Sequence, residues 1–579
     1  MAVTVSSMSY SNASESGTIG ALKPSTVIWF FAIAFLLLFA GYGLRDPWPA
    51  DEPRFVLVAK QMVESGQWLF PHRGQELYPD KPPVYFWLLS AAHALTGSWR
   101  WSFLLPSLLS GMAVLWLTFD LGRRLWNPRS GLWAAVAVLA SLQFLYQFKR
   151  AQIDPTLVAM TTASFYLIAR HLLERRDWRL LYAGFLLAGL GVITKGVGFL
   201  PLLALAPLAL YRRYGFAPLT PAQPRDAWRW TAAFGFLLLP IALWLGAIVT
   251  LGLTSGNPEH AEYLRNILFK QTAERYANPW HHHEPFWYFA EIIALFWLPF
   301  SLAGFWLWRP WRAAFAQREL KTVLPLVWGV LVVLFFSISS GKRDMYILPA
   351  LPAFALAATP YLQAVSERAG FRRLLLGFVL LLGALLAGLG AAALHGQAGF
   401  AEKLIAERGL GQEVRWLWWM LCAVGAIALL AGLWLRTRGA LAAAAIALSG
   451  VWLGYGLVAH PVLDASSSAA ALMQRAYVQA GPGTEIGLVA WKEQNLLQAR
   501  GRVTEFGFRR AEREQLARGI AWMAQSPQTR LLMVNEIAAL DCVDFGGTGT
   551  LPLEKANRRS WWLVNVQAVT RCRASAPGE

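Results

Sequence analysis

Charged side chains are scarce in this sequence and make up 15% of its 579 residues. A soluble protein of this length carries about a quarter charged residues. Long apolar runs take their place, such as "VIWFFAIAFLLLFAGYGL" from Val27 and "FLLLPIALWLGAIVTLGL" from Phe236. Runs of this length are typical of transmembrane helices. The composition therefore excludes an ordinary soluble protein and predicts a polytopic membrane protein.

Acidic residues are the scarcer sign of charge, with 34 Asp and Glu against 52 Lys and Arg and a net charge of +18. In a soluble protein this excess favours a nucleic-acid partner, but no module combining basic and aromatic residues occurs here. The basic residues cluster instead in short loops between apolar segments, as in the cytoplasmic loops of membrane proteins. We therefore exclude nucleic acid and expect the lipid bilayer, including its anionic headgroups, as the partner.

The basic loops also define a predicted topology. Six of them, among them "GRRLWNPR" and "ERRDWR", are placed in the cytoplasm together with residues 1–26. Both ends of the apolar segment 83–97 then lie outside, so this segment is predicted to lie against the membrane without crossing it. The remaining apolar segments predict thirteen spans: 27–45, 100–121, 131–148, 155–173, 178–194, 197–212, 230–253, 286–308, 322–339, 346–364, 372–394, 416–435 and 439–459.

The predicted membrane domain thus covers 27–460, with outer loops at 46–99 and 254–286. From 461 to 579 the chain has strand-like segments such as "TEIGLVA" and "TRLLMVN", and the helical segment "EREQLARGIAWMAQ". They predict a small α/β domain on the outer side. Because "GPGTEIG" lacks the dinucleotide-binding spacing, no organic cofactor is expected. The fold class is a polytopic α-helical membrane protein with a C-terminal α/β soluble domain.

Cysteine is rare, with three residues in the chain. Cys422 falls in an apolar span and is expected to be inert. Cys542 and Cys572 both fall in the outer α/β domain, where an oxidising compartment allows a disulfide. Sequence does not show whether the two lie close enough to pair, so both states remain open.

The polar residues of the membrane domain collect in the loops predicted to face outward. Ionisable groups at the edge of a helical bundle are costly unless they are paired or functional. Lys342 and Arg343 lie on this side against the charge rule, which indicates a site for a phosphate-bearing lipid. The candidates are Asp51, Glu52, Arg54, Tyr78, Asp80, Lys81, Asp154, Lys195, His260, His281, His283, Lys342, Arg343 and Tyr346.

Each candidate also has a structural explanation. Asp51 and Asp154 both precede helical segments and are suitable N-cap residues. Lys195 is long enough to extend its amine to the membrane surface. His281 and His283 lack the H-E-x-x-H spacing of a helical zinc site and suit a solvated loop equally well.

Six stretches occur in a fixed order between residues 51 and 349: "DEPRF", "DKPPVYFW", "QIDP", "TKGVGFL", "HEPFWYF" and "SGKRDMYILP". On these stretches the chain resembles the GT-C fold polyprenyl-phosphate glycosyltransferases, and most of all the bacterial aminoarabinose transferases that modify lipid A. The resemblance implies a monomeric, inverting enzyme in the bacterial inner membrane with its active site on the periplasmic side. The implied donor is undecaprenyl-phosphate 4-amino-4-deoxy-L-arabinose and the implied acceptor is a lipid A phosphate. Adding an amino sugar masks that phosphate and weakens the binding of cationic peptides such as polymyxin.

The resemblance also assigns roles to the candidates. Asp51, Asp154 and Glu52 are the expected catalytic carboxylates, and Lys195 is expected to bind substrate. The expected ligands of the donor phosphate are Lys81, Arg54, Tyr346, Lys342, Arg343 and Tyr78. A divalent metal would be held by Asp80, His260, His281 and His283.

Two other functions remain open at this point. A protein O-mannosyltransferase, or another polyprenyl-phosphate sugar transferase, shares the acidic, Lys-Pro and aromatic motifs. A flippase or transporter would show inverted repeats and ionisable residues near the bilayer midplane. No repeat is evident and the polar residues gather at one face, which favours the transferase.

Overall fold

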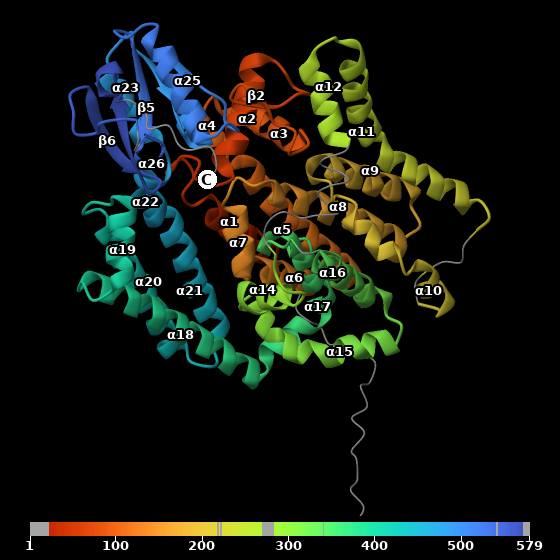
Figure 1. Cartoon of the computed structure of the whole chain (residues 1–579). Coiled ribbons are helices and arrows are strands. Elements are labelled where there is room, and N and C mark those ends of the chain that lie inside the picture. Colours follow the sequence, from red (N-terminus) through yellow and green to blue (C-terminus); the bar gives the residue numbers. More distant parts are fainter. Residues whose placement is uncertain are drawn as a thin grey trace, which may run out of the picture.

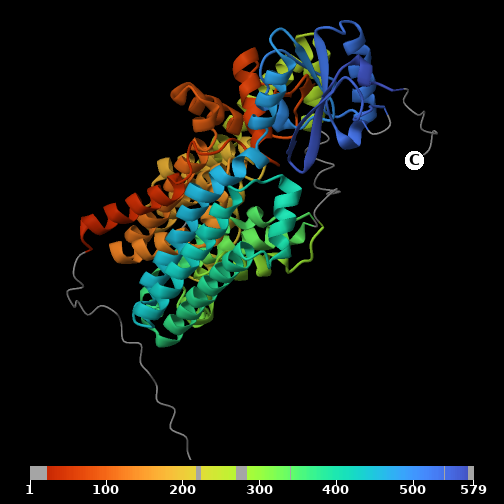
Figure 2. The same cartoon turned by 90° about the vertical axis from the view of Figure 1, so that its left-hand side faces the viewer.

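A computed structural model describes residues 22–570, except 217–218, 220–222, 269–282, 340 and 540–541. Helices fill most of the molecule, and an α/β domain lies at one end of the helical bundle (Figure 1). A view turned by 90° shows the same domain beyond the end of the bundle (Figure 2). The loops that were predicted to face outward lie at this same end of the bundle (Figure 1).

The described residues include eight helices that are long and apolar enough to cross a membrane. They are Trp99–Leu125 (α4 and α5), α8 Ile153–Leu173, α9 Trp178–Lys195, α11 Asp226–Thr254, α16 Leu320–Ile338, α18 Ala369–Leu394, α20 Val414–Leu435 and Ala440–Ser467 (α21 to α22). Two bent pairs raise the number to ten: α6 Pro128–Ala140 with α7 Leu142–Phe148, and α14 Tyr288–Phe296 with Phe300–Ala316 (η3 and α15). The chain is a multi-pass membrane protein.

The predicted count of thirteen spans is not confirmed, and three segments account for the difference. The first, 27–45, corresponds to α1 Pro24–Phe39, which has only 16 residues. The second, 197–212, is not one helix but a 3₁₀ turn, η1 Leu200–Leu205, followed by α10 Leu208–Arg213. Pro201 and Pro207 lack the N–H groups that a continuous helix needs. The third, 346–364, starts as the 3₁₀ turn η4 Asp344–Ile347 and continues as α17 Ala350–Glu367.

The large loop 46–99, which was predicted to face outward, contains two helices and a hairpin. Helix α2 Glu52–Ser65 is buried on several sides in its first half, where Phe55, Val56 and Val58 are covered, and it also buries Met62. The hairpin pairs β1 His72–Arg73 with β2 Glu76–Leu77. Helix α3 Val84–Thr96 has 13 residues. At 1.5 Å per residue it is about 20 Å long, shorter than a bilayer core, which agrees with the predicted non-crossing helix.

The C-terminal domain has a five-stranded mixed sheet in the order β4-β3-β5-β7-β6. Strand β3 pairs in parallel with β4 and β5, whereas β7 runs antiparallel to β5 and β6. The predicted strands and the helix near 512 are confirmed. The elements are β3 Glu485–Leu488, β4 Val503–Glu505, β5 Arg530–Asn535, β6 Thr550–Ala556, β7 Arg559–Val564, α23 Ala470–Ala480, α24 Glu493–Leu497, α25 Glu512–Ala524, α26 Glu536–Ala539 and η6 Val566–Ala568. Two further helices, α12 Pro258–Arg265 and α19 Gly399–Arg408, follow α11 and α18.

Helices α9 and α11 pack closely because Gly189 has no side chain. A Cβ atom built at Gly189 would lie 2.1 Å from the carbonyl oxygen of Leu237 and 2.7 Å from Pro240. A backbone carbonyl cannot turn away as a flexible side chain can. The helix spacing at this point therefore requires glycine.

We expect Gly189→Ala to lower the thermal unfolding temperature of the protein in detergent, because the methyl group forces α9 and α11 apart. Overpacking of this kind costs about 1–3 kcal/mol. Gly246→Ala is the matched control, since a Cβ atom there meets no other atom within 4 Å. An equal unfolding temperature for the two variants would contradict the close packing.

Candidate functional site

Four of the six resemblance stretches meet at the outer end of the bundle. Asp51 precedes α2, Asp154 lies in the first turn of α8, Lys195 ends α9, and Tyr346 lies in η4. Gln152 links the segment of Asp154 to Asp51, and Arg343 links η4 to Asp51. Residues nearly 300 positions apart in the sequence thus form one site.

Asp51 contacts polar groups on two neighbouring segments. Its Oδ2 accepts hydrogen bonds from Gln152 Nε2 at 3.5 Å and Arg343 Nη2 at 3.3 Å. Arg54 Nη1 lies 3.7 Å from Oδ1. The carboxylate makes no capping hydrogen bond to α2, although the residue occupies the N-cap position. The alternative role as a helix cap is therefore wrong, and Asp51 faces the site.

Asp154 forms a second acidic centre in the same site. It is buried and makes an ion pair with Lys195. Lys195 Nζ also lies 5.0 Å from the centre of the Tyr346 ring, within cation–π distance. Gln152, not Asp154, occupies the N-cap position of α8, so the capping explanation is wrong here too. Lys195 is bound within the site and does not extend to the membrane surface.

Glu52 occupies the centre of a buried hydrogen-bond network. Its carboxylate accepts from Arg45 Nη1 at 2.5 Å and Arg45 Nη2 at 2.7 Å. It also accepts from the backbone N–H groups of Trp48 at 2.8 Å and Ala151 at 2.9 Å. Glu52 is 1% exposed and Arg45 is 2% exposed. Both carboxylate oxygens are thus occupied, and Glu52 ties the end of α1 to α2 and α8.

Lys149 places a second buried basic group beside Arg45. Its amine donates to the carbonyl oxygens of Leu37 at 2.7 Å and Ala40 at 2.6 Å, at the end of α1. Burial and the neighbouring Arg45 lower the pKa of Lys149 to about 7.

The predicted phosphate ligands occupy different environments. Arg54 Nε donates to Glu493 in the C-terminal domain at 2.8 Å, and Lys342 Nζ donates to the carbonyl oxygen of Glu284 at 2.7 Å. Asp80 and Lys81 are half-buried in the turn before α3. Tyr78 is buried, and burial raises the pKa of its phenol well above the usual value.

The predicted metal ligands that the structure describes, Asp80, His260 and His283, do not form a cluster with one another. The His260 ring stacks on Phe70 at 3.8 Å, and its Nδ1 lies 2.8 Å from Ser255 Oγ. His283 forms an isolated bridge with Gly341, and His281 lies outside the described residues. Within the described ranges, no three His, Cys, Asp or Glu side chains form a cluster that could hold an ion. The metal stays a prediction, and no chemical step depends on it.

Four residues that organise the site were not among the candidates predicted from the sequence: Arg45, Lys149, Gln152 and Glu493. Arg45 immediately precedes "DPWP" at the end of an apolar run, and this unusual place for a charge was a signal. Glu493 accepts from Arg54 and, at 3.2 Å, from Arg73 Nη1. No local pattern could reveal this contact, because Glu493 lies 439 positions from Arg54.

Cys422 is a free thiol, whereas Cys542 is disulfide-bonded. The chain has three cysteines in all. The predicted partner, Cys572, lies outside the described residues.

The architecture places the chain in the GT-C structural class. It matches the crystal structure of ArnT from Cupriavidus metallidurans bound to undecaprenyl phosphate with a TM-score of 0.71 and 19% identity, covering 94% of this chain and 98% of that chain. The apo structure of the same protein gives a TM-score of 0.69 with 19% identity, covering 94% and 99%. The fold predicted from the sequence is confirmed.

Sequence comparison gives more specific relatives. The chain is 29% identical to undecaprenyl phosphate-alpha-4-amino-4-deoxy-L-arabinose arabinosyl transferase from Pectobacterium carotovorum, over 60% of each chain. It is 28% identical to transferase 2 of the same description from Pseudomonas fluorescens, over 62% of this chain and 64% of the relative. The chain thus matches less than two thirds of the length of these relatives. Residues 80–249 match the family model described as dolichyl-phosphate-mannose-protein mannosyltransferase. These similarities confirm the resemblance predicted from the motifs.

Glu52→Gln should strongly lower the thermal unfolding temperature, because it leaves the buried Arg45 without a counter-charge. Removing one partner of a buried ion pair costs about 3–5 kcal/mol. Glu64→Gln on the same helix is the control: Glu64 is 60% exposed and lies 3.9 Å from Lys60. An exposed pair of this kind contributes at most about 1 kcal/mol. Similar unfolding temperatures for the two variants would rule out the structural role of Glu52.

Proposed function

We propose that the protein transfers 4-amino-4-deoxy-L-arabinose from undecaprenyl phosphate to a phosphate group of lipid A. The relatives carry the name of this reaction, and the ArnT structure of the same fold binds undecaprenyl phosphate. The observation that carries the proposal is the convergence of Asp51, Asp154, Lys195, Arg343 and Tyr346 at the outer end of the bundle. The enzyme acts as a monomer in the bacterial inner membrane, with this site facing the periplasm.

The donor leaves a phosphate, so negative charge develops on the leaving group during transfer. Arg343 and Lys195 supply cations at the site, and the phenol of Tyr346 supplies a hydrogen-bond donor. We expect Lys81, in the turn before α3, to bind the same phosphate. Arg54 and Lys342 have other contacts, with Glu493 and with the carbonyl oxygen of Glu284. We therefore infer that Arg54 and Lys342 are positioning residues.

The acceptor phosphate is already anionic near neutral pH and needs no general base. One of its oxygens attacks C1 of the sugar while the bond from C1 to the donor phosphate breaks, so the configuration at C1 inverts. Undecaprenyl phosphate leaves with the electron pair of that bond. Asp51 stabilises positive charge on the sugar, and Asp154 holds Lys195 in place. Glu52 acts through Arg45 as a positioning residue.

The addition of this amino sugar to lipid A explains a role in resistance to cationic peptides. The amino group of the added sugar is cationic, and it offsets the charge of the lipid A phosphate. Cationic peptides such as polymyxin are then attracted less strongly to the outer surface of the cell.

Protein O-mannosylation is the second candidate, because the mannosyltransferase family model matches residues 80–249. A protein hydroxyl must lose its proton on attack, so Asp51 would then act as a general base. Mass spectrometry of lipid A from cells with and without the protein separates the two functions. A 4-amino-4-deoxy-arabinose mass shift supports the main proposal, and its absence with mannosylated protein supports the alternative.

Asp51→Asn and Lys81→Ala should each lower transfer to lipid A in isolated membranes by at least about 100-fold, because each removes a charge that acts on the transition state. Transfer is measured by mass spectrometry after immunoblotting has shown equal protein levels. Glu64→Gln and Lys403→Ala are the controls, since their side chains are 60% and 77% exposed. Full activity in Asp51→Asn or Lys81→Ala would refute the assignment.

Glu493→Gln should lower kcat about tenfold with little change in KM, because Arg54 loses the contact that orients it beside Asp51. The double variant Arg54→Gln/Glu493→Gln should be no slower than Arg54→Gln alone, since the two residues act as one unit. Glu514→Gln is the control: Glu514 also contacts two arginines, Arg510 and Arg518, but is 46% exposed. Additive losses in the double variant would contradict the coupling.

A further inference from the structure

A basic pocket lies at the opposite end of the bundle from the proposed active site. Helix α8 has Asp154 at one end and His171 near the other, and α9 runs back from Trp178 to Lys195. With a rise of 1.5 Å per residue, the 21 residues of α8 separate the two ends by roughly 30 Å. This distance matches the hydrocarbon core of a bilayer. The pocket therefore lies at the level of the headgroups of the other leaflet.

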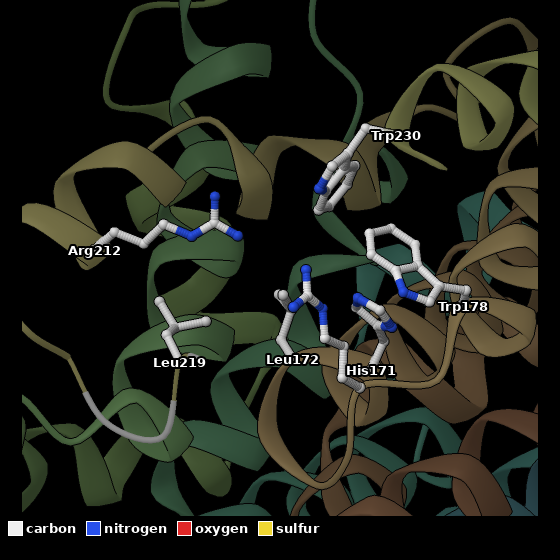
Figure 3. Close-up of a pocket in the computed structure, with 7 residues that line it drawn as sticks. His171, Leu172, Trp178, Arg212, Leu219 and Trp230 are labelled. Atoms are coloured by element: carbon white, nitrogen blue, oxygen red, sulfur yellow. The ribbon is translucent and has the colours of Figure 1, made fainter. Parts of the chain in front are cut away.

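The pocket combines guanidinium groups with indole rings. It is lined by His171, Arg176, Trp178, Arg212 and Trp230, together with two leucines. Arg212 extends toward the space from one side, and the rings of Trp178, Trp230 and His171 lie across from it (Figure 3). His171 Nδ1 donates to the carbonyl oxygen of Asp177 at 2.8 Å, which fixes the ring.

The positive charge of the pocket exceeds the negative charge around it. The guanidinium carbons of Arg176 and Arg229 lie 5.3 Å and 5.2 Å from the Trp178 ring centre. Asp226 makes an ion pair with Arg176, and Asp177 contacts Arg175 at 3.3 Å. Within the described part of the chain, neither Arg212 nor Arg229 has a carboxylate at ion-pair distance. Two guanidinium groups thus remain available to an anion.

An apolar surface continues from this pocket along α11. Asp226 and Arg229 lie in the first turn of that helix. Farther along, α11 exposes large apolar side chains: Phe234, Leu238, Leu239, Leu243 and Leu253. Only 11% of the most apolar 18-residue stretch of α11 is buried within the protein. In a bilayer this face contacts acyl chains, so the pocket and the helix together match a headgroup and its tails.

We propose that the residues around this pocket bind the phosphodiester headgroup of an anionic phospholipid at the pocket mouth, since the cavity itself measures about 20 Å³, and that the acyl chains lie along α11. Basic pockets between transmembrane helices on the cytoplasmic side are suited to anionic headgroups. Indole rings favour this depth because one edge is apolar and the N–H group is polar. The inference does not depend on the proposed transferase reaction, because no residue of the pocket belongs to the outer site.

The test compares lipid retention by two double variants of equal charge. Arg212→Gln/Arg229→Gln removes the two guanidinium groups without a carboxylate partner and keeps the pair between Arg176 and Asp226. Arg179→Gln/Arg213→Gln is the control, because neither residue lines the pocket, as Arg212 does, or lies over one of its rings, as Arg229 lies over Trp178. Each purified full-length protein is titrated in detergent with phosphatidylglycerol or phosphatidylcholine, and bound lipid is counted by native mass spectrometry.

The wild-type protein and the control should bind one phosphatidylglycerol at least about tenfold more tightly than Arg212→Gln/Arg229→Gln, and phosphatidylcholine should not show this difference. Inorganic phosphate and glycerol 3-phosphate are added as competitors. Displacement of the lipid by either at low concentration would assign the pocket to a free phosphate compound and overturn the lipid proposal. Equal retention of phosphatidylglycerol by both double variants would also overturn it. Thermal unfolding of each variant shows whether the fold is intact.

Discussion

The buried ion pair of Arg45 and Glu52 is the contact on which the outer site depends. It joins the end of α1 to the start of α2, and the N–H group of Ala151 connects the same carboxylate to the segment before α8. Asp51 is the neighbour of Glu52, so fixing Glu52 also fixes where Asp51 can point. Removing two charges from water is costly, and the four hydrogen bonds to Glu52 offset that cost. The pair therefore orders the site through buried contacts.

The cations of the outer site differ in how firmly they are held. Arg54 is shared between Asp51 and Glu493, and Lys342 donates to a backbone carbonyl. Arg343 contacts Asp51 at 3.3 Å and its side chain is 36% exposed. Arg54 is nearly as exposed, at 30%, but is held by two carboxylates, and Lys342 is buried, so a phosphate has fewer contacts to replace at Arg343. Arg343 is thus better placed than Arg54 or Lys342 to meet a charged ligand.

The sequence predicted features that rest on local pattern. Apolar runs and strand-like segments indicated most spanning helices and the C-terminal sheet, and the motif order indicated which outer loops meet. It failed where proline or tertiary contacts decide the structure. The 197–212 segment has the composition of a span, but Pro201 and Pro207 break it into short turns. Local sequence left a cap role for Asp51 and Asp154 open, because their carboxylates bind cations from distant segments.

The C-terminal domain illustrates the same limit and has a physical role in the site. Its Glu493 is 5% exposed and accepts from both Arg54 and Arg73, so two cations of the outer loop depend on one carboxylate from beyond the last span. Glu505 accepts from the N–H group of Gln75 at 2.8 Å, which adds a second anchor to the same loop. A loop of this length loses much conformational entropy when it is ordered. Contacts from the C-terminal domain offset that entropy, and they form where α24 packs against α2.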